Sequence, residues 1–259
     1  MTRVQSPQKL EGGRRLRSGT RDASFLLTIV TVVFRAESEL RTLIDSIVSL
    51  KDADIELIVI DGGSQDDTCA ILSSYGDNID YWVSESDNGI YDAMNKGVSL
   101  AQGTFILHIN AGDRLLYIPK QELRTADENS FDAAAFHVLI DNKIEFRPSF
   151  SYSLRFNNTL HHQGTFFRKL ALPKYNIEYK VFADFDVNQQ LALRGARVAL
   201  FGDIVASHLS EGVSDTPTPT TVSEFFRIIR KNYGALHLPI AWLMCKWRGL
   251  VSRIAQFRQ

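Results

Sequence analysis

The sequence predicts an α/β fold with a mostly parallel sheet and helices on both faces. Over the first 113 residues, apolar runs of strand length alternate with segments of helical periodicity. The apolar runs are continuous rather than alternating, as in strands that are buried on both faces. The chain has 259 residues and a hydrophobic fraction of 44%, which is enough for one large domain or two small ones.

The elements follow one another in a β-α-β-α-β-α-β order. Strands are predicted over 25–34, 56–61, 81–85 and 104–109, with an amphipathic helix over about 40–48 and further helices opening near 64 and 90. Such alternation indicates parallel strands joined by helical crossovers. Beyond residue 113 the pattern changes to a hairpin over 131–147, a helix over about 184–194 and a short strand over 198–201.

Acidic and amide side chains follow three of these strands. They are Asp61, then Glu85 and Asp87, then Asn110 and Asp113. Because ligands of open α/β sheets bind at the carboxyl ends of the strands, we expect these groups to line one site. A divalent cation that bridges two phosphates needs only one or two carboxylates, and Asp113 is the predicted one. The alternative is that Asn110–Asp113 is an ordinary turn.

Two phosphate-binding loops are missing from the sequence. Neither G-x-G-x-x-G nor G-x-x-x-x-G-K-[ST] occurs, so a dinucleotide site and a P-loop are both excluded. A net charge of −1 gives no attraction to nucleic acid. Cys69 and Cys245 form neither a disulfide framework nor a zinc pattern, which favours a reducing, cytoplasmic location. No apolar run reaches the roughly 18 residues of a membrane span.

The domain organisation follows from composition. We expect a disordered basic tail over 1–23, a linker over 216–221, and a nucleotide half (24–113) and an acceptor half (114–215) of one domain between them. Residues 222–259 are predicted to be a basic amphipathic helical tail. That tail either packs on the domain or lies on an anionic membrane as an interfacial helix.

Several motifs occur together in one order. They are Thr31-Val-Val-Phe, Val59-Ile-Asp-Gly-Gly-Ser-Gln-Asp-Asp-Thr68, Asp87-Asn-Gly-Ile-Tyr-Asp-Ala-Met-Asn-Lys-Gly97, Asn110-Ala-Gly-Asp113, His162-Gln163, Ala183-Asp184 and Glu211-Gly-Val-Ser214. With them the chain resembles the inverting GT-A glycosyltransferases of family 2, in particular the bacterial branch that builds exopolysaccharide, colanic acid or O-antigen. The resemblance covers roughly residues 25–214.

The resemblance implies a role for each matching residue. On the donor side, Asp61 would lie near the base and ribose, and Asp87, Asp92 and Asn95 would line the donor site. Asn110 and Asp113 would occupy the D-x-D region, and Asp113, with His208, would bind Mg²⁺ or Mn²⁺. Asp184 would be the general base, with Asp186 as its runner-up, and His162 and Gln163 would contact acceptor or pyrophosphate. Each has a structural alternative: a helix N-cap for Asp184, internal hydrogen bonding for His162 and Gln163, and a buried histidine for His208.

Two positions depart from the family pattern. Many relatives carry a second Asp where Gly62 stands, and the D-x-D is reduced to Asn110-Ala-Gly-Asp113. The expected reaction is transfer from a UDP-, GDP- or dTDP-sugar to a glycan or polyprenyl-diphosphate-linked acceptor, in the cytoplasm or on the inner face of the membrane. The alternatives are a non-catalytic sugar-nucleotide or polysaccharide-binding subunit of the same fold, and a nucleotidyltransferase, for which Phe34-Arg35-Ala36-Glu37 supplies no Gly-rich basic loop.

Overall fold

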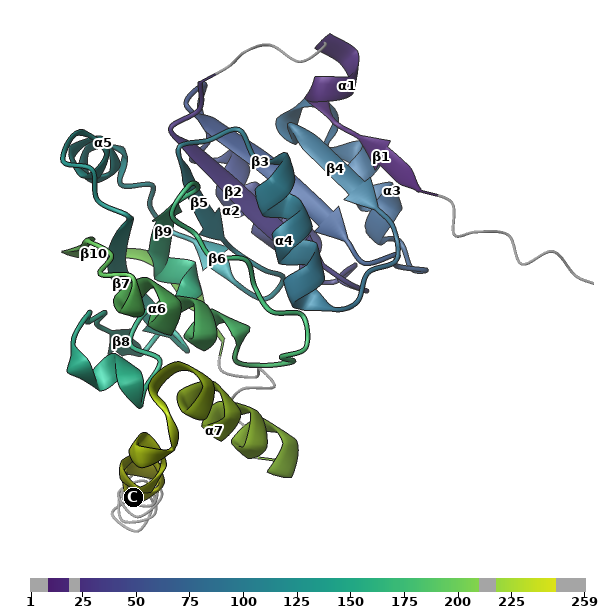
Figure 1. Ribbon diagram of the computed structural model, residues 1–259. Helices are drawn as coiled ribbons and strands as arrows, with labels where there is room; N and C mark the ends of the chain where they lie inside the picture. Colours follow the sequence, from purple (N-terminus) through teal and green to yellow (C-terminus); the bar gives the residue numbers. More distant parts are fainter. Residues whose placement is uncertain (1–8, 19–23, 210–217, 246–259) are drawn as a thin grey trace, which may run out of the picture.

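The computed structural model describes residues 9–18, 24–209 and 218–245, which form one sheet flanked by helices (Figure 1). The first elements after residue 24 are β2 (Leu27–Val33), α2 (Leu40–Val48), β3 (Ile55–Asp61), α3 (Thr68–Ser74), η1 (Gly76–Asn78), β4 (Tyr81–Ser84), α4 (Ile90–Leu100) and β5 (Phe105–His108). The predicted alternation is therefore confirmed. These four strands lie in the order β4-β3-β2-β5 and are all parallel, so their carboxyl ends share one edge.

The second half of the chain extends the same sheet. Its elements are β6 (Arg114–Leu115), α5 (Lys120–Glu128), β7 (Ala133–Ile140), β8 (Ile144–Phe146), η2 (Tyr152–Arg155), η3 (His162–Gly164), β9 (Thr165–Arg168), α6 (Ala183–Leu193) and β10 (Val198–His208). Strand β9 lies antiparallel between β5 and β7, and β10 runs parallel to β7. The predicted hairpin is confirmed as β7–β8. Strand β10 is longer than the predicted four residues.

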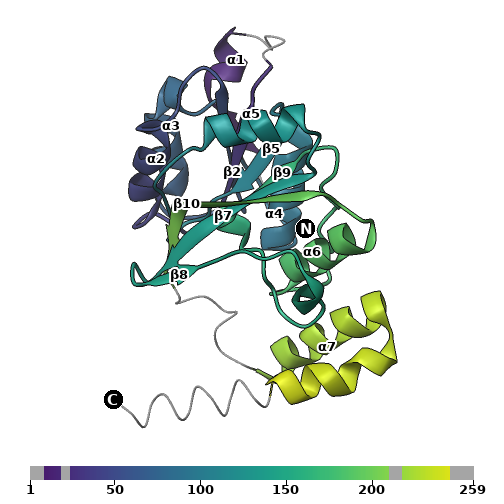
Figure 2. The ribbon, with the colours of Figure 1, turned by 90° about the vertical axis from the view of Figure 1, so that its left-hand side faces the viewer.

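Helices cover both faces of the sheet, as the sequence predicts (Figure 2). On one face, α2, α3 and α5 pack through side chains such as Leu43 and Leu123 against the strands. On the other face, α4 and α6 pack through Met94 and Phe185. Both faces of the central strands are buried because each strand sends alternate side chains into the two cores.

The expectation of a disordered tail over 1–23 is wrong for residues 9–18. Strand β1 (Leu10–Gly12) pairs antiparallel with β4, and helix α1 (Arg14–Ser18) follows it. The reason is electrostatic: Arg15 forms an ion pair with Glu56, which is fully buried, and Arg14 forms one with buried Asp80. Two buried carboxylates thus hold an arginine-rich segment that composition alone describes as disordered. The rest of 1–23 lies outside the described residues.

The expected linker over 216–221 is also wrong where the structure describes it. Helix α7 (Pro219–Tyr233) begins inside that range, with Thr218 as its N-cap in a capping box with Thr221 and with proline in its first turn. Gly234 ends the helix, and η5 (Ala235–His237) leads into a helical stretch over 238–245. Helix α7 packs on α6. Its contacts support the packed alternative for 218–233, while the tail beyond 245 lies outside the described residues. None of the described helices is both long enough and apolar enough to cross a membrane.

Candidate active site

The turn after β5 both closes on itself and presents a carboxylate. The backbone N–H of Asn110 donates to Asp113 Oδ2 at 2.8 Å, and the Asp113 N–H donates to the Asn110 carbonyl at 3.0 Å. Gly112 takes a φ of +89°, a conformation that favours glycine. Asn110–Asp113 is therefore a turn, as the structural alternative predicts, but its Asp113 carboxylate also contacts side chains outside the turn.

Asp113 contacts two side chains from the second half of the chain. His208, at the end of β10, places Nδ1 2.7 Å from Asp113 Oδ1, and Gln163 Nε2 donates to the two carboxylate oxygens at 3.2 and 3.1 Å. The Asp113 side chain is only 2% exposed and that of His208 is 22% exposed. Residues about 50 and 95 positions apart in sequence thus converge on one carboxylate.

His162 connects this carboxylate to Asp184. Its Nε2 lies 3.4 Å from Asn110 Nδ2, and its Nδ1 lies 3.6 Å from Asp184 Oδ2. His161 stacks on His162 with ring centroids 5.6 Å apart and lies 5.2 Å from the ring of His208. Burial, with the charges of the two neighbouring rings, lowers the pKa of His161 to about 4. His161 is therefore neutral near pH 7, between two rings that reach the two carboxylates.

Asp184 is not the N-cap of its helix. Phe182 holds that position in α6, and Asp184 is the second helical residue. Its carboxylate accepts from Asn158 Nδ2 at 2.7 Å and from the Phe185 N–H at 2.8 Å, and its side chain is 14% exposed. Burial alone would raise the pKa of Asp184. The hydrogen bond and charge of His162 and the Phe185 N–H outweigh burial, so the pKa lies below its usual value.

Helix α7 fixes the backbone that carries Asp184. The Glu224 carboxylate accepts from three successive backbone N–H groups, those of Lys180, Val181 and Phe182, at 2.7, 2.9 and 2.6 Å. Glu224 is only 6% exposed. These bonds end one residue before α6 begins, so the C-terminal helix helps to set the position of Asp184.

A cavity of about 620 Å³ opens at the carboxyl ends of β2, β3 and β4. Its walls include the exposed ring of Phe34, the backbone of Gly62 and Gly63, and Asp87. A Cβ atom added to Gly62 would lie 2.8 Å from Asp87 Oδ2. The Asp87 carboxylate therefore stands beside the position where many relatives carry their second Asp.

Asp61 lies at this edge, with its carboxylate bonded inside the β3–α3 turn and to β4. It is fully buried and accepts from the Ser64 N–H at 2.9 Å and from Ser84 Oγ at 2.6 Å, with a further bond from Ser64 Oγ. Asp61 therefore holds the β3–α3 turn together. The polar groups that reach the cavity come from its neighbours, Gly62 and Gly63.

Three other predicted residues lie outside the Asp113–Asp184 cluster. Asp92 accepts from the backbone and side chain of Asn88 at 3.0 and 3.1 Å, and the Asn88 N–H is the main reason that its pKa is lowered. Asn95 exchanges hydrogen bonds of 2.8 and 2.9 Å with the backbone of Tyr175. Asp186 is fully buried against α7, where Lys231 Nζ lies 3.0 Å away. The runner-up base thus faces away from the site.

Sequence reasoning missed four residues of the site. They are Phe34, Asn158, His161 and Glu224. An aromatic residue directly after a buried strand is a usable signal for Phe34. The other three act through contacts between distant segments, for which the sequence carries no local sign.

The donor atoms around Asp113 fit a hard divalent cation. Asn110 Oδ1 and Gln163 Oε1 are buried and have no hydrogen-bond partner among the described residues. With the Asp113 carboxylate and the His208 imidazole they form an oxygen-rich set of the kind that Mg²⁺ or Mn²⁺ accepts. Within the described ranges, no three His, Cys, Asp or Glu side chains are grouped to hold a metal.

Comparisons with known proteins identify the family of the chain. The Glycosyl transferase family 2 profile matches residues 28–169. A PGL/p-HBAD biosynthesis glycosyltransferase of Mycobacterium bovis is 30% identical over 251 residues, which cover 91% of this chain and 96% of that protein. An uncharacterized glycosyltransferase of Mycobacterium tuberculosis is 29% identical over 66% of this chain and 69% of its own length.

Solved structures show the same fold. Staphylococcus aureus TarS 1–349 in complex with UDP superposes with a TM-score of 0.64 at 16% identity, over 83% of this chain and 68% of that one. The complex of TarS 1–349 with UDP-GlcNAc gives 0.61 at the same identity. The chain spans 41% of the longer TarS crystal structure. The fold is GT-A, and the chain belongs to glycosyl transferase family 2, whose members are enzymes that transfer sugars.

Proposed function

We propose that this enzyme moves a sugar from a nucleotide-diphospho-sugar to a hydroxyl of a glycan or lipid-linked acceptor, with inversion at the anomeric carbon. The observation that supports this most is that Asn110 and His162 lie between Asp113 and Asp184: the Asn110 backbone N–H donates to Asp113, the Asn110 side chain contacts His162, and His162 Nδ1 lies 3.6 Å from Asp184 Oδ2. It joins a donor-side carboxylate at the sheet edge to a carboxylate on the acceptor side. Single displacement needs a base facing the donor in this way.

In the proposed mechanism the chain holds the donor and removes one proton. The nucleoside occupies the cavity beside Phe34, Gly62 and Asp87, and its diphosphate extends toward Asp113. Asp184 takes the proton of the acceptor hydroxyl as that oxygen attacks C1 from the side opposite the leaving group. The new C–O bond forms while the bond from C1 to the diphosphate breaks, and the electron pair leaves with the nucleoside diphosphate. His162 stabilises Asp184 as the anion.

Asp113, His208, Asn110 and Gln163 would hold Mg²⁺ or Mn²⁺. Such an ion offsets the negative charge that accumulates on the departing diphosphate. The buried oxygen atoms of Asn110 and Gln163 support this assignment.

Replacement of the base tests the proposal. Asp184→Asn keeps the shape of the side chain but cannot accept the proton, so kcat should fall about 10²–10⁴-fold. Donor binding, measured by calorimetry, should stay within about twofold of wild type because the cavity lies at the other end of the path. Asp203→Asn, at an exposed position of β10, is the matched control. Near-normal turnover of Asp184→Asn would contradict the assigned role.

The donor can be identified by ligand-induced stabilisation. UDP-, GDP- and dTDP-sugars are screened for a rise in Tm, since binding to the native state stabilises it. UDP-sugars come first in the panel because the TarS complexes contain UDP and UDP-GlcNAc. Slow hydrolysis of the stabilising donor without acceptor would exclude the alternative of a purely sugar-nucleotide-binding subunit.

The acceptor belongs, in our proposal, to cell-surface glycan or glycolipid biosynthesis. The mycobacterial relative is named a PGL/p-HBAD biosynthesis glycosyltransferase, so that protein acts in a biosynthetic pathway. A polyprenyl-diphosphate-linked glycan is one such acceptor. The enzyme would then work on the cytoplasmic face of the membrane, touching it through the stretch that follows α7.

A further inference from the structure

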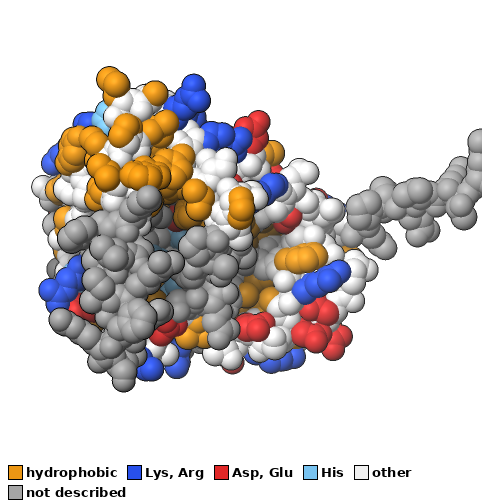
Figure 3. Space-filling view, turned by 90° about the horizontal axis from the view of Figure 1, so that it is seen from below, with side chains coloured by type: hydrophobic (Ala, Val, Ile, Leu, Met, Phe, Trp, Pro, Cys, Tyr) orange, Lys and Arg blue, Asp and Glu red, His pale blue; other side chains and the backbone are white. Residues whose placement is uncertain are grey.

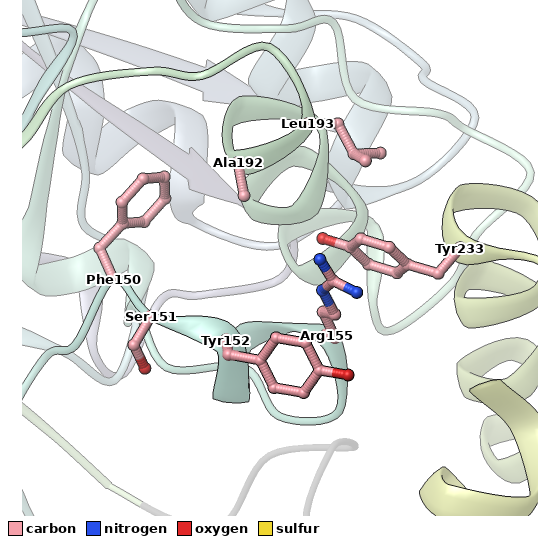
Figure 4. A pocket seen from close by; sticks show the side chains of 7 residues that line it. All are labelled: Phe150, Ser151, Tyr152, Arg155, Ala192, Leu193 and Tyr233. Atoms are coloured by element: carbon pink, nitrogen blue, oxygen red, sulfur yellow. The ribbon is translucent and has the colours of Figure 1, made fainter.

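A second cavity lies apart from the Asp113–Asp184 cluster, on the acceptor side of the molecule. It has a volume of about 290 Å³ and is formed by η2, the last turn of α6 and the end of α7 (Figure 4). Leu193 lines it, whereas Asp184 lies at the opposite end of α6, about 14 Å away along the helix axis. A group bound here therefore cannot be the one that reacts at Asp184.

The cavity contains a cation held between aromatic rings. The Arg155 guanidinium carbon lies 4.3 Å from the ring centroid of Tyr152 and 5.0 Å from that of Tyr233, and Figure 4 shows the guanidinium between the two rings. One of its nitrogens lies 3.2 Å from His237 Nε2. Among the described residues, no carboxylate pairs with Arg155. The rings occupy the faces of the guanidinium and His237 contacts one of its nitrogens, so its other N–H groups can donate to a ligand.

An arginine fixed in this way suits an oxyanion. The planar guanidinium donates two parallel hydrogen bonds to phosphate or carboxylate, and stacking on rings reduces the entropy lost when it binds. Its charge is balanced by no protein group in the described ranges, so an incoming anion gains the full charge-assisted interaction.

The cavity opens beside an exposed apolar surface. The chain that leaves Tyr233 carries Leu236, Ile240, Trp242 and Leu243, which are 90%, 45%, 49% and 60% exposed. His237, in the same stretch, contacts Arg155 and lies with its ring 5.5 Å from that of Tyr233. Figure 3 shows hydrophobic side chains gathered on this lower face, with lysine or arginine side chains near the edge. A cation at the rim of an apolar surface matches a lipid that carries a phosphate.

We propose that the Arg155 cavity binds the phosphate of a membrane lipid, with the apolar stretch 236–243 seated in the lipid surface. The inference deepens the acceptor side of the proposed function and rests on it only for its place in the reaction. The bound lipid is an anionic phospholipid of the bilayer, which presents its phosphate to Arg155 and holds the enzyme at the membrane.

The test is binding of the full chain to vesicles without any donor. Vesicles of phosphatidylcholine alone are compared with vesicles that also contain phosphatidic acid, and bound protein is measured by co-sedimentation. Wild type should prefer the phosphatidic acid vesicles, and Arg155→Gln should weaken that binding about tenfold. Arg147→Gln removes the same charge from a side chain that is 73% exposed on the protein surface and should change binding less than twofold.

Two further variants show whether vesicle binding depends on the Arg155 guanidinium or on the apolar stretch 236–243. Arg155→Lys keeps the charge but not the planar fork, so it should recover only part of the binding; full recovery would mean that a point charge suffices and would overturn the pocket. Leu236→Ser with Leu243→Ser should weaken binding to both vesicle types. The proposal would be overturned if Arg155→Gln and Arg147→Gln lost vesicle binding equally. It would also be overturned if inorganic phosphate stabilised the protein in a thermal-shift assay as much as phosphatidic acid does. Because no donor is present, the assay tests lipid binding alone. Lipid binding can fail while the proposed transfer reaction stands, and the transfer reaction can fail while lipid binding stands.

Discussion

Changing Glu224 to Gln should separate the positioning of Asp184, the proposed catalytic base, from the binding of the donor. The carboxylate accepts three backbone N–H groups, from Lys180, Val181 and Phe182, whereas the Gln side chain has one acceptor oxygen. At least one N–H then faces an NH₂ group. A hydrogen bond to a charged group contributes about 1.5–3 kcal/mol, so we expect a loss of about 3 kcal/mol in the free energy of unfolding.

The same change should lower kcat more than it alters donor binding. A shift of about 1 Å in a catalytic group costs about 10²-fold, so kcat should fall between about 10- and 100-fold. The donor KM should change less than about twofold, because the cavity at β2–β4 does not contact the 180–182 segment. Hydrogen exchange of the 180–182 amides should accelerate, which measures the loosening directly.

A matched control lies in the same loop. Glu178→Gln changes an exposed glutamate near the Glu224 contacts and should leave both kcat and exchange unchanged. If Glu224→Gln kept wild-type exchange at 180–182 and wild-type kcat, helix α7 would not position Asp184, and the reasoning would be refuted.

Three further perturbations test separate parts of the structure. His162→Gln should raise the pKa of Asp184, so the acid limb of the kcat–pH profile should move to higher pH. In wild type, Asp184 stabilises the fold at pH values above its unfolded pKa, and that contribution is lost as pH falls through the lowered folded pKa. Arg15→Ala leaves Glu56 buried without its cation and should cost about 3–5 kcal/mol in denaturant unfolding, with partial recovery by Glu56→Gln in the same chain. Asp113→Ala should weaken donor binding in calorimetry with Mn²⁺ far more than without it; equal affinities in both conditions would exclude the metal assignment.

The first half of the fold could be predicted because its signals are local. Continuous apolar runs such as 56–61 form strands that are buried on both faces, and each is followed by a helix within a short interval. The antiparallel strand β9 could not be predicted in this way, because it pairs with β5 across more than sixty residues and with β7 across 30 to 34 residues. Residues 9–18 were wrongly expected to be disordered for the same reason: their buried partners, Glu56 in β3 and Asp80 directly before β4, lie far away in the sequence.

The candidate site divides along the same line. Asp113 and Asp184 could be found because each stands at a predicted element boundary within a motif, and Asp87 because it follows a strand. Asp61 matches a motif equally well, yet its partners Ser64 and Ser84 lie in its own turn and in the neighbouring strand β4. The side-chain partners of Asp113, by contrast, come from the second half of the chain. A motif identifies a position in the chain, whereas the segments that meet there are set by the fold.

Strand β1 has a consequence for how the enzyme behaves among copies of itself. Without residues 9–12, strand β4 would present a row of unpaired N–H and C=O groups, which invites pairing with a strand of another molecule. The three-residue β1 ends that row, and the opposite margin of the sheet is finished by β6, which has two residues. A protein trimmed at its amino terminus would therefore be expected to self-associate through β4, even where its fold survives.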